Sequence, residues 1–406
     1  MRILYISQYF PPEVGATQTR AHEMAIYLAR QGHQVVVLTE FPNHPKGIIP
    51  PEYRGRLVEH TKMDGFDVVR VFVYTSPKKN FATRMGFYLS FMFIAALVGS
   101  FLRGRFDVVY ATSPPFFVGL AGVWLSRIKG ARFVLEIRDL WPQTAVELGE
   151  LKNERFIRWS EKLEMFYYRK ADCIVAVTKG IYQNLVNRVG ADKVRLIPNG
   201  ANTDLFYYRG DAVKQKLGLH DKFVVLYAGI FGIAQGMEQL CELVQSMKSD
   251  DSIHFVFIGE GPLKQQVEDI RQKKSLTNLT ILDEIAREEI PAYISAADCC
   301  LVPLKKNPLF LGALPSKMFD FMACERPVIV SVDGEARRVV QESGAGIFVE
   351  PENTLQMAEA IRKLKETPEL VIKMGKAGRQ YVARNFSRKM NAQRLEKLLQ
   401  EMLAAG

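Results

Sequence analysis

Short apolar runs alternate with amphipathic stretches along the whole chain. In the first half, the runs that predict strands lie at 3–6, 35–38, 68–73, 108–111, 132–137, 174–177 and 194–197. In the second half they lie at 223–228, 254–258, 280–282, 299–303, 328–330 and 346–349. Stretches with helical periodicity separate these runs, and the last of them covers 385–403. This alternation predicts an α/β fold with parallel sheets.

The pattern starts a second time in the middle of the chain. Pro198-Asn199-Gly200 ends the first series, and the residues up to about 219 show no clear period. A strand, a glycine-bearing loop and a helix then follow, as at the start of the chain. We predict two Rossmann-like domains, 1–198 and 199–384, with a C-terminal helix 385–406 that can pack back on the first. Because ligands of open parallel sheets bind beyond the carboxyl ends of the strands, we expect the site in a cleft between the domains.

The charge is distributed unevenly. The formal net charge is +10, and residues 1–198 hold 27 Lys and Arg against 17 Asp and Glu, so the whole excess lies there. This excess favours an anionic partner such as acidic lipid, a phosphorylated substrate or nucleic acid. A solvated surface that keeps the protein soluble explains it equally well. With 48% apolar residues, the chain is not a disordered one.

One apolar stretch, 85–102, contains no charged residue. It is long enough to be a membrane-span candidate, but a single crossing would separate the strands predicted on either side of it. A buried core helix and a helix in the membrane interface remain as interpretations. We favour the interface. The expected lipid contacts are Phe87, Phe91 and Phe93, with Lys78, Lys79, Arg84, Arg103 and Arg105 as a basic fringe.

Three ionisable residues follow the strand predicted at 132–137. Glu136, Arg138 and Asp139 lie where a parallel sheet presents side chains to a ligand. Asp139 could orient or deprotonate an acceptor hydroxyl, and Arg138 could hold a phosphate. A buried structural ion pair has comparable weight.

Glycines follow several of the predicted strands. Gly15, Gly229 and Gly232 lie before helices, where the backbone can approach a phosphate, and Gly259 and Gly261 could open a sheet edge to a flat ligand. Ordinary turns are the alternative. The glycine fingerprint of dinucleotide-binding domains is absent, and no Lys-Ser or Lys-Thr pair completes a P-loop. These absences argue against a dehydrogenase and exclude a P-loop.

The segment 314–324 contains the densest chemical signal. Pro315 suits the first turn of a helix, which places Ser316 and Lys317 where N–H groups and an ammonium converge on an anion. Asp320 lies about one turn later on nearly the same face. A cation for a diphosphate beside a carboxylate for a ribose suits a nucleotide-sugar. An exposed lysine–aspartate pair is the alternative.

Metal ligands are not evident in the sequence. The six histidines have no metal-ligand spacing, and no Asp-x-Asp pair occurs, so we predict no metal site. The five cysteines suit reduced thiols in a cytosolic protein.

Together these motifs resemble the retaining GT-B glycosyltransferases of family GT4, and within them the WbuB-like group of bacterial polysaccharide and O-antigen enzymes. The resemblance covers essentially the whole chain. It is carried by Phe10-Pro11-Pro12-Glu13 with Gly15, Phe41-Pro42-Asn43-His44-Pro45, Asp139-Leu140-Trp141-Pro142, Pro198-Asn199-Gly200, Gly259-Glu260-Gly261-Pro262, and Pro315-Ser316-Lys317 through Pro327-Val328. The motifs are specific in combination and weak singly.

The resemblance implies retaining transfer of an N-acetylated or deoxy hexose from a UDP-linked donor, held by the second domain. The first domain would bind a polyprenyl-diphosphate-linked saccharide acceptor at the anionic inner face of the cell membrane. No metal, other cofactor or nucleic acid is implied. Lys317, Arg138 and Asp139 are the expected catalytic residues, and Glu13, Arg20 and Glu136 are assigned to the acceptor side.

The sequence departs from the family pattern at the donor positions. Asp320 stands where a glutamate usually grips the ribose, and Gly312 stands where a second glutamate contacts the sugar. Ile233 and Gln235 occupy the loop where a lysine or arginine is common, which leaves Lys317 and Lys305 to balance the diphosphate. Two other functions therefore remain open: an epimerase of the same fold that acts on a UDP-sugar without an acceptor, and an inactive nucleotide-sugar-binding module.

Overall fold

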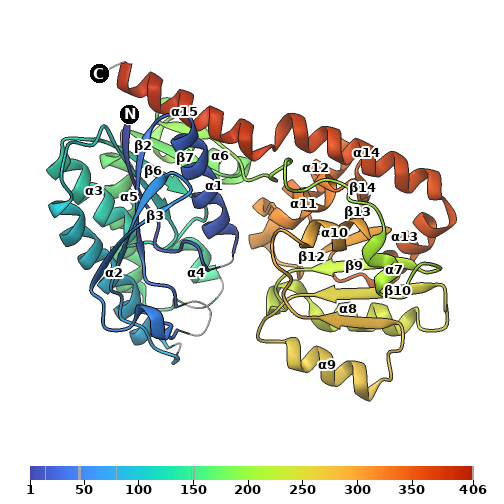
Figure 1. Ribbon diagram of the computed structural model, residues 1–406. Coiled ribbons are helices and arrows are strands. Elements are labelled where there is room, and N and C mark those ends of the chain that lie inside the picture. The colour runs from blue at the N-terminus through green and yellow to red at the C-terminus, as the bar shows by residue number, and fades with distance from the viewer. Residues whose placement is uncertain (14, 44–46, 79, 148, 150, 405–406) are drawn as a thin grey trace. The chain divides into compact units, whose positions relative to one another are not determined.

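The computed structural model describes residues 1–13, 15–43, 47–78, 80–147, 149 and 151–404. The chain forms two compact units (Figure 1). Unit 1 comprises Met1–Asn199 and Lys389–Gly406, and unit 2 comprises Gly200–Arg388.

Unit 1 is built on an eight-stranded sheet in the order β3-β4-β2-β1-β5-β6-β7-β8. The strands are β1 (Arg2–Ile6), β2 (Gln34–Glu40), β3 (Val58–Met63), β4 (Phe66–Val71), β5 (Val108–Ser113), β6 (Arg132–Ile137), β7 (Cys173–Ala176) and β8 (Val194–Leu196). All pairs are parallel except β3 with β4. The seven predicted strands are confirmed. β3 was not predicted because this edge strand is largely exposed and polar.

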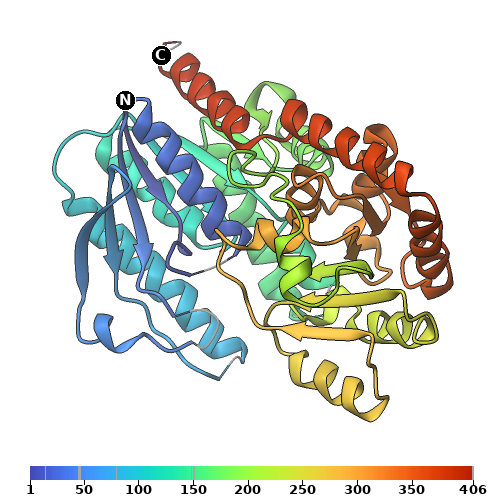
Figure 2. The ribbon, with the colours of Figure 1, turned by 45° about the vertical axis from the view of Figure 1, so that its right-hand side comes forward.

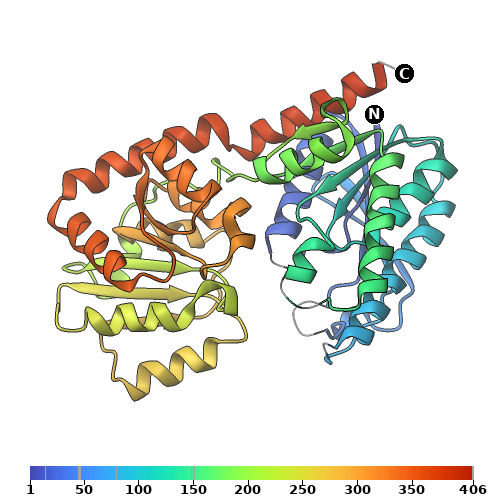
Figure 3. The ribbon, with the colours of Figure 1, turned by 180° about the vertical axis from the view of Figure 1, so that it is seen from behind.

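The helices of unit 1 cover both faces of its sheet. They are α1 (Ala16–Arg30), α2 (Phe81–Phe101), α3 (Val118–Lys129), α4 (Gln143–Glu147), α5 (Glu154–Lys170), α6 (Lys179–Val189) and α15 (Arg388–Ala404), with short 3-10 turns at Pro51–Tyr53 and Ala191–Lys193. Side chains of α2, α3, α5 and α6 pack on one face, and those of α1 and α15 on the other. Figure 3 shows α2, α3 and α5 side by side.

The C-terminal helix predicted over 385–403 is confirmed as α15, which begins three residues later than predicted. α14 ends at Asn385 and α15 begins at Arg388. Between the two helices, the Phe386 ring stacks on Phe319 inside unit 2, with ring centroids 4.4 Å apart. α15 then lies beside α1 in unit 1, where Glu396 accepts hydrogen bonds from Tyr27 at 3.1 Å and His33 at 2.9 Å (Figure 2).

Unit 2 contains a six-stranded parallel sheet in the order β11-β10-β9-β12-β13-β14. The strands are β9 (Phe223–Ala228), β10 (Ile253–Ile258), β11 (Leu279–Leu282), β12 (Cys299–Pro303), β13 (Val328–Ser331) and β14 (Gly346–Phe348). All six were predicted. A helix follows each of these strands in the chain, so several helix starts come after the carboxyl ends of the strands.

The helices of unit 2 also form two layers. They are α7 (Ala212–Lys216), α8 (Met237–Ser246), α9 (Lys264–Lys273), α10 (Ile290–Ser295), α11 (Ser316–Ala323), α12 (Glu335–Ser343), α13 (Thr354–Glu366) and α14 (Pro368–Asn385), with 3-10 turns at Ile233–Gln235 and Pro308–Gly312. Helices α10, α11 and α12 contribute to the core on one face of the sheet. Helices α8, α9 and α13 contribute to the core on the other.

Candidate functional site

In unit 2, the ammonium group of Lys317 has a surrounding that is unusual for a charged side chain. Lys317 lies in the first turn of α11, and its Nζ atom is 3.0 Å from where a Cβ atom on Gly229 would be. The Nζ atom is buried and has no hydrogen-bond partner among the described residues. It lies 4.0 Å from the centroid of the Tyr227 ring. Burial lowers the pKa of the ammonium to about 7. A buried cation that contacts a ring and has no ion pair within the described ranges is suited to bind an anion.

The glycines at the ends of β9 and β10 allow two loops to pack tightly. A Cβ atom on Gly259 would overlap the carbonyl oxygen of Gly229, and one on Gly261 would lie 2.6 Å from the Phe231 carbonyl oxygen. Gly259 has a φ of 145°, which disfavours other residues. Their lack of side chains therefore serves loop packing, and the predicted opening of a sheet edge to a ligand stays a prediction. Gly229 instead leaves room for the Lys317 ammonium.

The remaining donor-side residues lie around the same helix start. Ser316 begins α11, whose first backbone N–H groups have no acceptor within the helix, and Asp320 follows Lys317 by one turn. Ser316, Lys317 and Asp320 are all half-buried. Gly232 lies at the start of the 3-10 turn Ile233–Gln235. A Cβ atom on Gly312 would meet no atom within 4 Å, so this position is open space.

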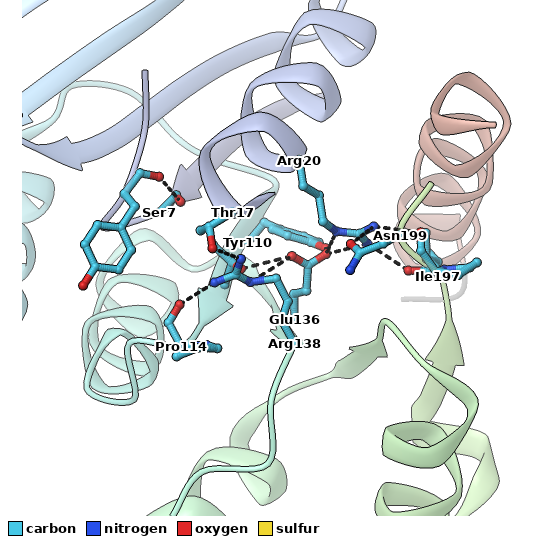
Figure 4. Close-up of polar contacts among 12 residues, drawn as sticks. Ser7, Thr17, Arg20, Tyr110, Pro114, Glu136, Arg138, Ile197 and Asn199 are labelled. Carbon is cyan, nitrogen blue, oxygen red and sulfur yellow. Dashed lines mark hydrogen bonds and ion pairs between the residues drawn. The ribbon is translucent and has the colours of Figure 1, made fainter. Parts of the chain in front are cut away.

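In unit 1, Glu136 lies at the centre of a buried network at the end of β6 (Figure 4). Its carboxylate accepts hydrogen bonds from Arg20 Nε at 2.9 Å, Tyr110 Oη at 2.6 Å and Thr112 Oγ1 at 3.0 Å. Burial alone would raise the pKa of Glu136, but Arg20 and Arg138 and the Tyr110 hydroxyl outweigh burial and lower it. Glu136 is therefore held as a carboxylate.

The same network fixes Arg20. Its guanidinium donates to the carbonyl oxygens of Ile197 at 2.9 Å and Pro198 at 2.8 Å (Figure 4). Arg20 is 4% exposed and Glu136 1% exposed. Both residues therefore support the site from inside the unit. Their assignment to the acceptor side stays a prediction, and their burial favours a positioning role over direct contact with an acceptor.

Arg138 and Asp139 lie at the edge of this network. Arg138 donates to the Pro114 carbonyl oxygen at 2.7 Å and to the Thr17 hydroxyl in the first turn of α1 (Figure 4). Burial lowers the pKa of Arg138, and Glu136 opposes this shift. Asp139 is half-buried and accepts a hydrogen bond from Thr144 Oγ1 at 2.7 Å. Both side chains remain partly accessible, unlike Glu136.

A second buried polar cluster lies where β1 and β2 end. Glu40 accepts hydrogen bonds from Gln8 Nε2 and Asn43 Nδ2, both at 2.7 Å. Glu13 accepts one from the Asn43 backbone N–H at 2.7 Å and is 8% exposed, and its assignment to the acceptor side stays a prediction. Burial first, and Glu13 second, raise the pKa of Glu40 well above its usual range.

Gly15 adds no ligand cradle by itself. Its backbone is extended, and a Cβ atom there would meet only the Gln18 side-chain oxygen, which can move.

The sequence did not predict Tyr227, Tyr110 and Glu40 as part of the site. For Glu40, a carboxylate that ends an otherwise apolar strand was an available signal, whereas nothing in the sequence pairs Tyr227 with Lys317. No cluster of three or more potential metal ligands occurs among the described residues.

The predicted apolar helix is present as α2, and it is long and apolar enough to cross a membrane by length and composition alone. Only 17% of its most apolar window is buried. Phe93, Leu97 and Phe101 point outward, with 65%, 61% and 78% exposed. Phe87 is half-buried, and Phe91 is fully buried against the sheet, so the predicted lipid contact of Phe91 is wrong. Lys78, Arg84, Arg103 and Arg105 are exposed, and Lys79 lies outside the described residues.

Comparisons with known proteins identify both halves of the chain. Residues 15–200 match the family model of the glycosyl transferase 4-like domain, and residues 211–381 match that of glycosyl transferases group 1. WcaI of Escherichia coli K12, whose name assigns it provisionally to colanic acid biosynthesis as a glycosyl transferase, is 23% identical over 402 residues. That match covers 96% of this chain and 97% of WcaI.

Solved structures share the fold across the full length. Sucrose-phosphate synthase from Thermosynechococcus elongatus has a TM-score of 0.72 and 21% identity, with all of both chains covered. HepE of Anabaena, solved in complex with UDP, has a TM-score of 0.71 and 16% identity over 99% of this chain and 100% of HepE. With the two family matches and the two parallel α/β units, these findings show that the chain belongs to the GT4 family of glycosyltransferases and has the GT-B fold.

Proposed function

We propose that the enzyme transfers a sugar, with retention, from a UDP-sugar to a polyprenyl-diphosphate-linked saccharide in the biosynthesis of a surface polysaccharide. The name of WcaI supports the polysaccharide, and the UDP complex of HepE supports the nucleotide. The N-acetylated or deoxy hexose remains part of the same proposal. The reaction needs no metal in this account.

The observation that carries the proposal is the buried ammonium of Lys317, which has no hydrogen-bond partner in the described part of the chain. A donor diphosphate would supply the missing counter-charge, next to N–H groups at the start of α11. Asp320 would bind the ribose hydroxyls one turn later. Because negative charge grows on the diphosphate as it leaves, a fixed cation stabilises the transition state more than the ground state.

Unit 1 would bind the acceptor near Arg138 and Asp139. Arg138 is held by Thr17 and Pro114, and the 11% of its side chain that is exposed can contact a phosphate of the acceptor. Asp139 can orient the attacking hydroxyl. The bond from the sugar to the diphosphate breaks, the acceptor oxygen bonds on the same face, and its proton passes to a donor phosphate oxygen.

The acceptor in this proposal is a membrane lipid, and α2 supports a position at the membrane. Its outward side chains Phe93, Leu97 and Phe101 form an uncharged stripe, which is unusual for the solvent side of a surface helix. Exposed arginines lie at both ends of the helix. We propose peripheral binding to the anionic inner face of the cell membrane.

Lys317→Ala tests the donor assignment. With saturating acceptor and donor, turnover should fall at least about tenfold, which corresponds to about 1.4 kcal/mol. Lys273→Ala, an exposed lysine at the end of α9, is the matched control and should keep wild-type turnover. A Lys317→Ala enzyme with less than about a tenfold loss contradicts the assigned role.

A further inference from the structure

Six aromatic rings form a continuous cluster at the surface of unit 1. The rings come from the start of α2 (Phe81), the start of α3 (Phe116 and Phe117), the loop after β6 (Trp141) and the start of α5 (Phe156 and Trp159). Each ring lies between 4.2 and 6.5 Å from a neighbour by centroid distance. We call these six residues the aromatic cluster.

The aromatic cluster links the candidate acceptor loop to solvent. Trp141 follows Asp139 by two residues and contacts Phe116 at 4.2 Å and Phe156 at 6.5 Å. Phe156 in turn contacts Phe81 at 5.7 Å and Trp159 at 5.5 Å. The inner rings of Phe116 and Phe117 are buried, whereas Phe81 and Trp159 are 53% and 47% exposed. An apolar path thus runs from the acceptor loop to the surface.

Exposed cations are close in sequence to the exposed rings. Residues 152–162 contain exposed Lys152, Arg155, Arg158 and Lys162 against the exposed acids Glu154 and Glu161. A second group of cations, Lys78 and Arg84, lies near Phe81 in sequence. Exposed aromatic area next to cations suits a molecule with an apolar chain and an anionic head.

We propose that the aromatic cluster is the seat for the first isoprene units of the acceptor lipid. This inference rests on the proposed function and assigns a binding site for the chain. The branched hydrocarbon would cover Phe81 and Trp159, and the diphosphate would lie between the α5 cations and Arg138. The seat is distinct from the stripe of Phe93, Leu97 and Phe101. α2 is about 30 Å long, and the stripe lies toward its other end.

Soluble isoprenoid probes test the seat without requiring transfer. Binding of farnesyl diphosphate and of inorganic diphosphate is measured by calorimetry with saturating UDP, which keeps either probe from Lys317. The wild type should bind farnesyl diphosphate at least about tenfold more tightly. Trp159→Ser should remove that difference, and Trp159→Phe should restore most of it.

Trp124→Ser is the matched control. Trp124 is 54% exposed on α3, and its indole donates to Ser100 near the end of α2, away from the aromatic cluster. It should keep the preference for farnesyl diphosphate. Any of three results would contradict this binding site. They are equal binding of both probes by the wild type, an unchanged preference in Trp159→Ser, and an equal loss of preference in Trp124→Ser.

The same variants separate the seat from the proposed function. Wild-type protein that prefers farnesyl diphosphate but transfers no sugar to any polyprenyl-linked acceptor would contradict the proposed function and leave the seat standing. Transfer to lipid acceptors without any preference for the isoprenoid chain would contradict the seat alone. Vesicle binding of Trp159→Ser should remain at the wild-type level, because the stripe on α2 is intact. A parallel loss of vesicle binding would overturn the seat in favour of direct insertion of these rings into the bilayer.

Discussion

The Lys317 ammonium lies 4.0 Å from the centre of the Tyr227 ring and has no hydrogen-bond partner among the described residues. The ring face supplies partial negative charge, which compensates burial only in part. The pKa of Lys317 is accordingly lowered to about 7. A donor diphosphate would reverse this shift.

This relationship predicts proton uptake on donor binding. Above about pH 7 the free enzyme has lost the Lys317 proton, and a bound diphosphate would restore it. UDP affinity should therefore fall as the pH rises from about 7.5 to about 8.5, where the diphosphate itself is already ionised. Calorimetry in buffers with different ionisation enthalpies measures the uptake. Lys317→Met should bind UDP weakly with no uptake, and a pH-independent wild-type affinity would contradict the assignment.

Gly259→Ala should destabilise unit 2. The added methyl group would overlap the Gly229 carbonyl oxygen, and the φ of 145° is unfavourable for alanine. We expect a loss of about 2 kcal/mol or more in the free energy of unfolding, together with weaker UDP binding. Gly312→Ala is the control, because its methyl group enters open space and should change stability by less than about 0.5 kcal/mol. Similar denaturation curves for the two variants would refute the packing role of Gly259.

Glu136→Gln should lower the free energy of unfolding of unit 1. The substitution keeps the shape of the side chain but leaves the guanidinium of Arg20, which is 4% exposed, without a counter-charge. Breaking a buried pair of this kind costs roughly 3–5 kcal/mol. Glu52→Gln, at an exposed position, should be neutral. Urea unfolding measures both, and a loss below about 1 kcal/mol in Glu136→Gln would show that the network is not held by charge.

Phe91 and Phe93 should respond in opposite ways, although they are two residues apart on α2. Phe91→Ala removes a fully buried ring and should cost about 3–5 kcal/mol of folding stability. Phe93→Ser removes a ring that is 65% exposed, so the fold should hold while binding to anionic vesicles falls. Thermal unfolding and vesicle flotation separate the two effects. Undiminished flotation of a double Phe93→Ser, Leu97→Ser variant would contradict membrane binding through α2.

The strands were predictable because each buried parallel strand is a compact apolar run. The strand Val58–Met63 was not predicted because an exposed edge strand needs no such apolar run. The orientation of α2 was not predicted for a different reason. Its apolar residues surround the helix, so periodicity could not show that Phe91 faces the sheet and Phe93 faces outward.

The candidate site was predictable in its residues and less so in its contacts. Strand ends and a helix start pointed to Arg138, Asp139 and Lys317, which remain partly accessible or lack a partner. Glu136 and Arg20 lie 116 residues apart in the chain, and only the folded sheet brings them within 2.9 Å. The collision that Gly259 avoids with Gly229 likewise depends on two loops that are distant in sequence.

Transfer of labelled sugar from a panel of UDP-sugars into membrane lipid, with a chelator present, tests the central claim most directly. We expect label from a cognate donor to enter the organic-extractable lipid only when a polyprenyl diphosphate saccharide is supplied. Donor that is epimerised or left unconsumed whatever acceptor is added would contradict it.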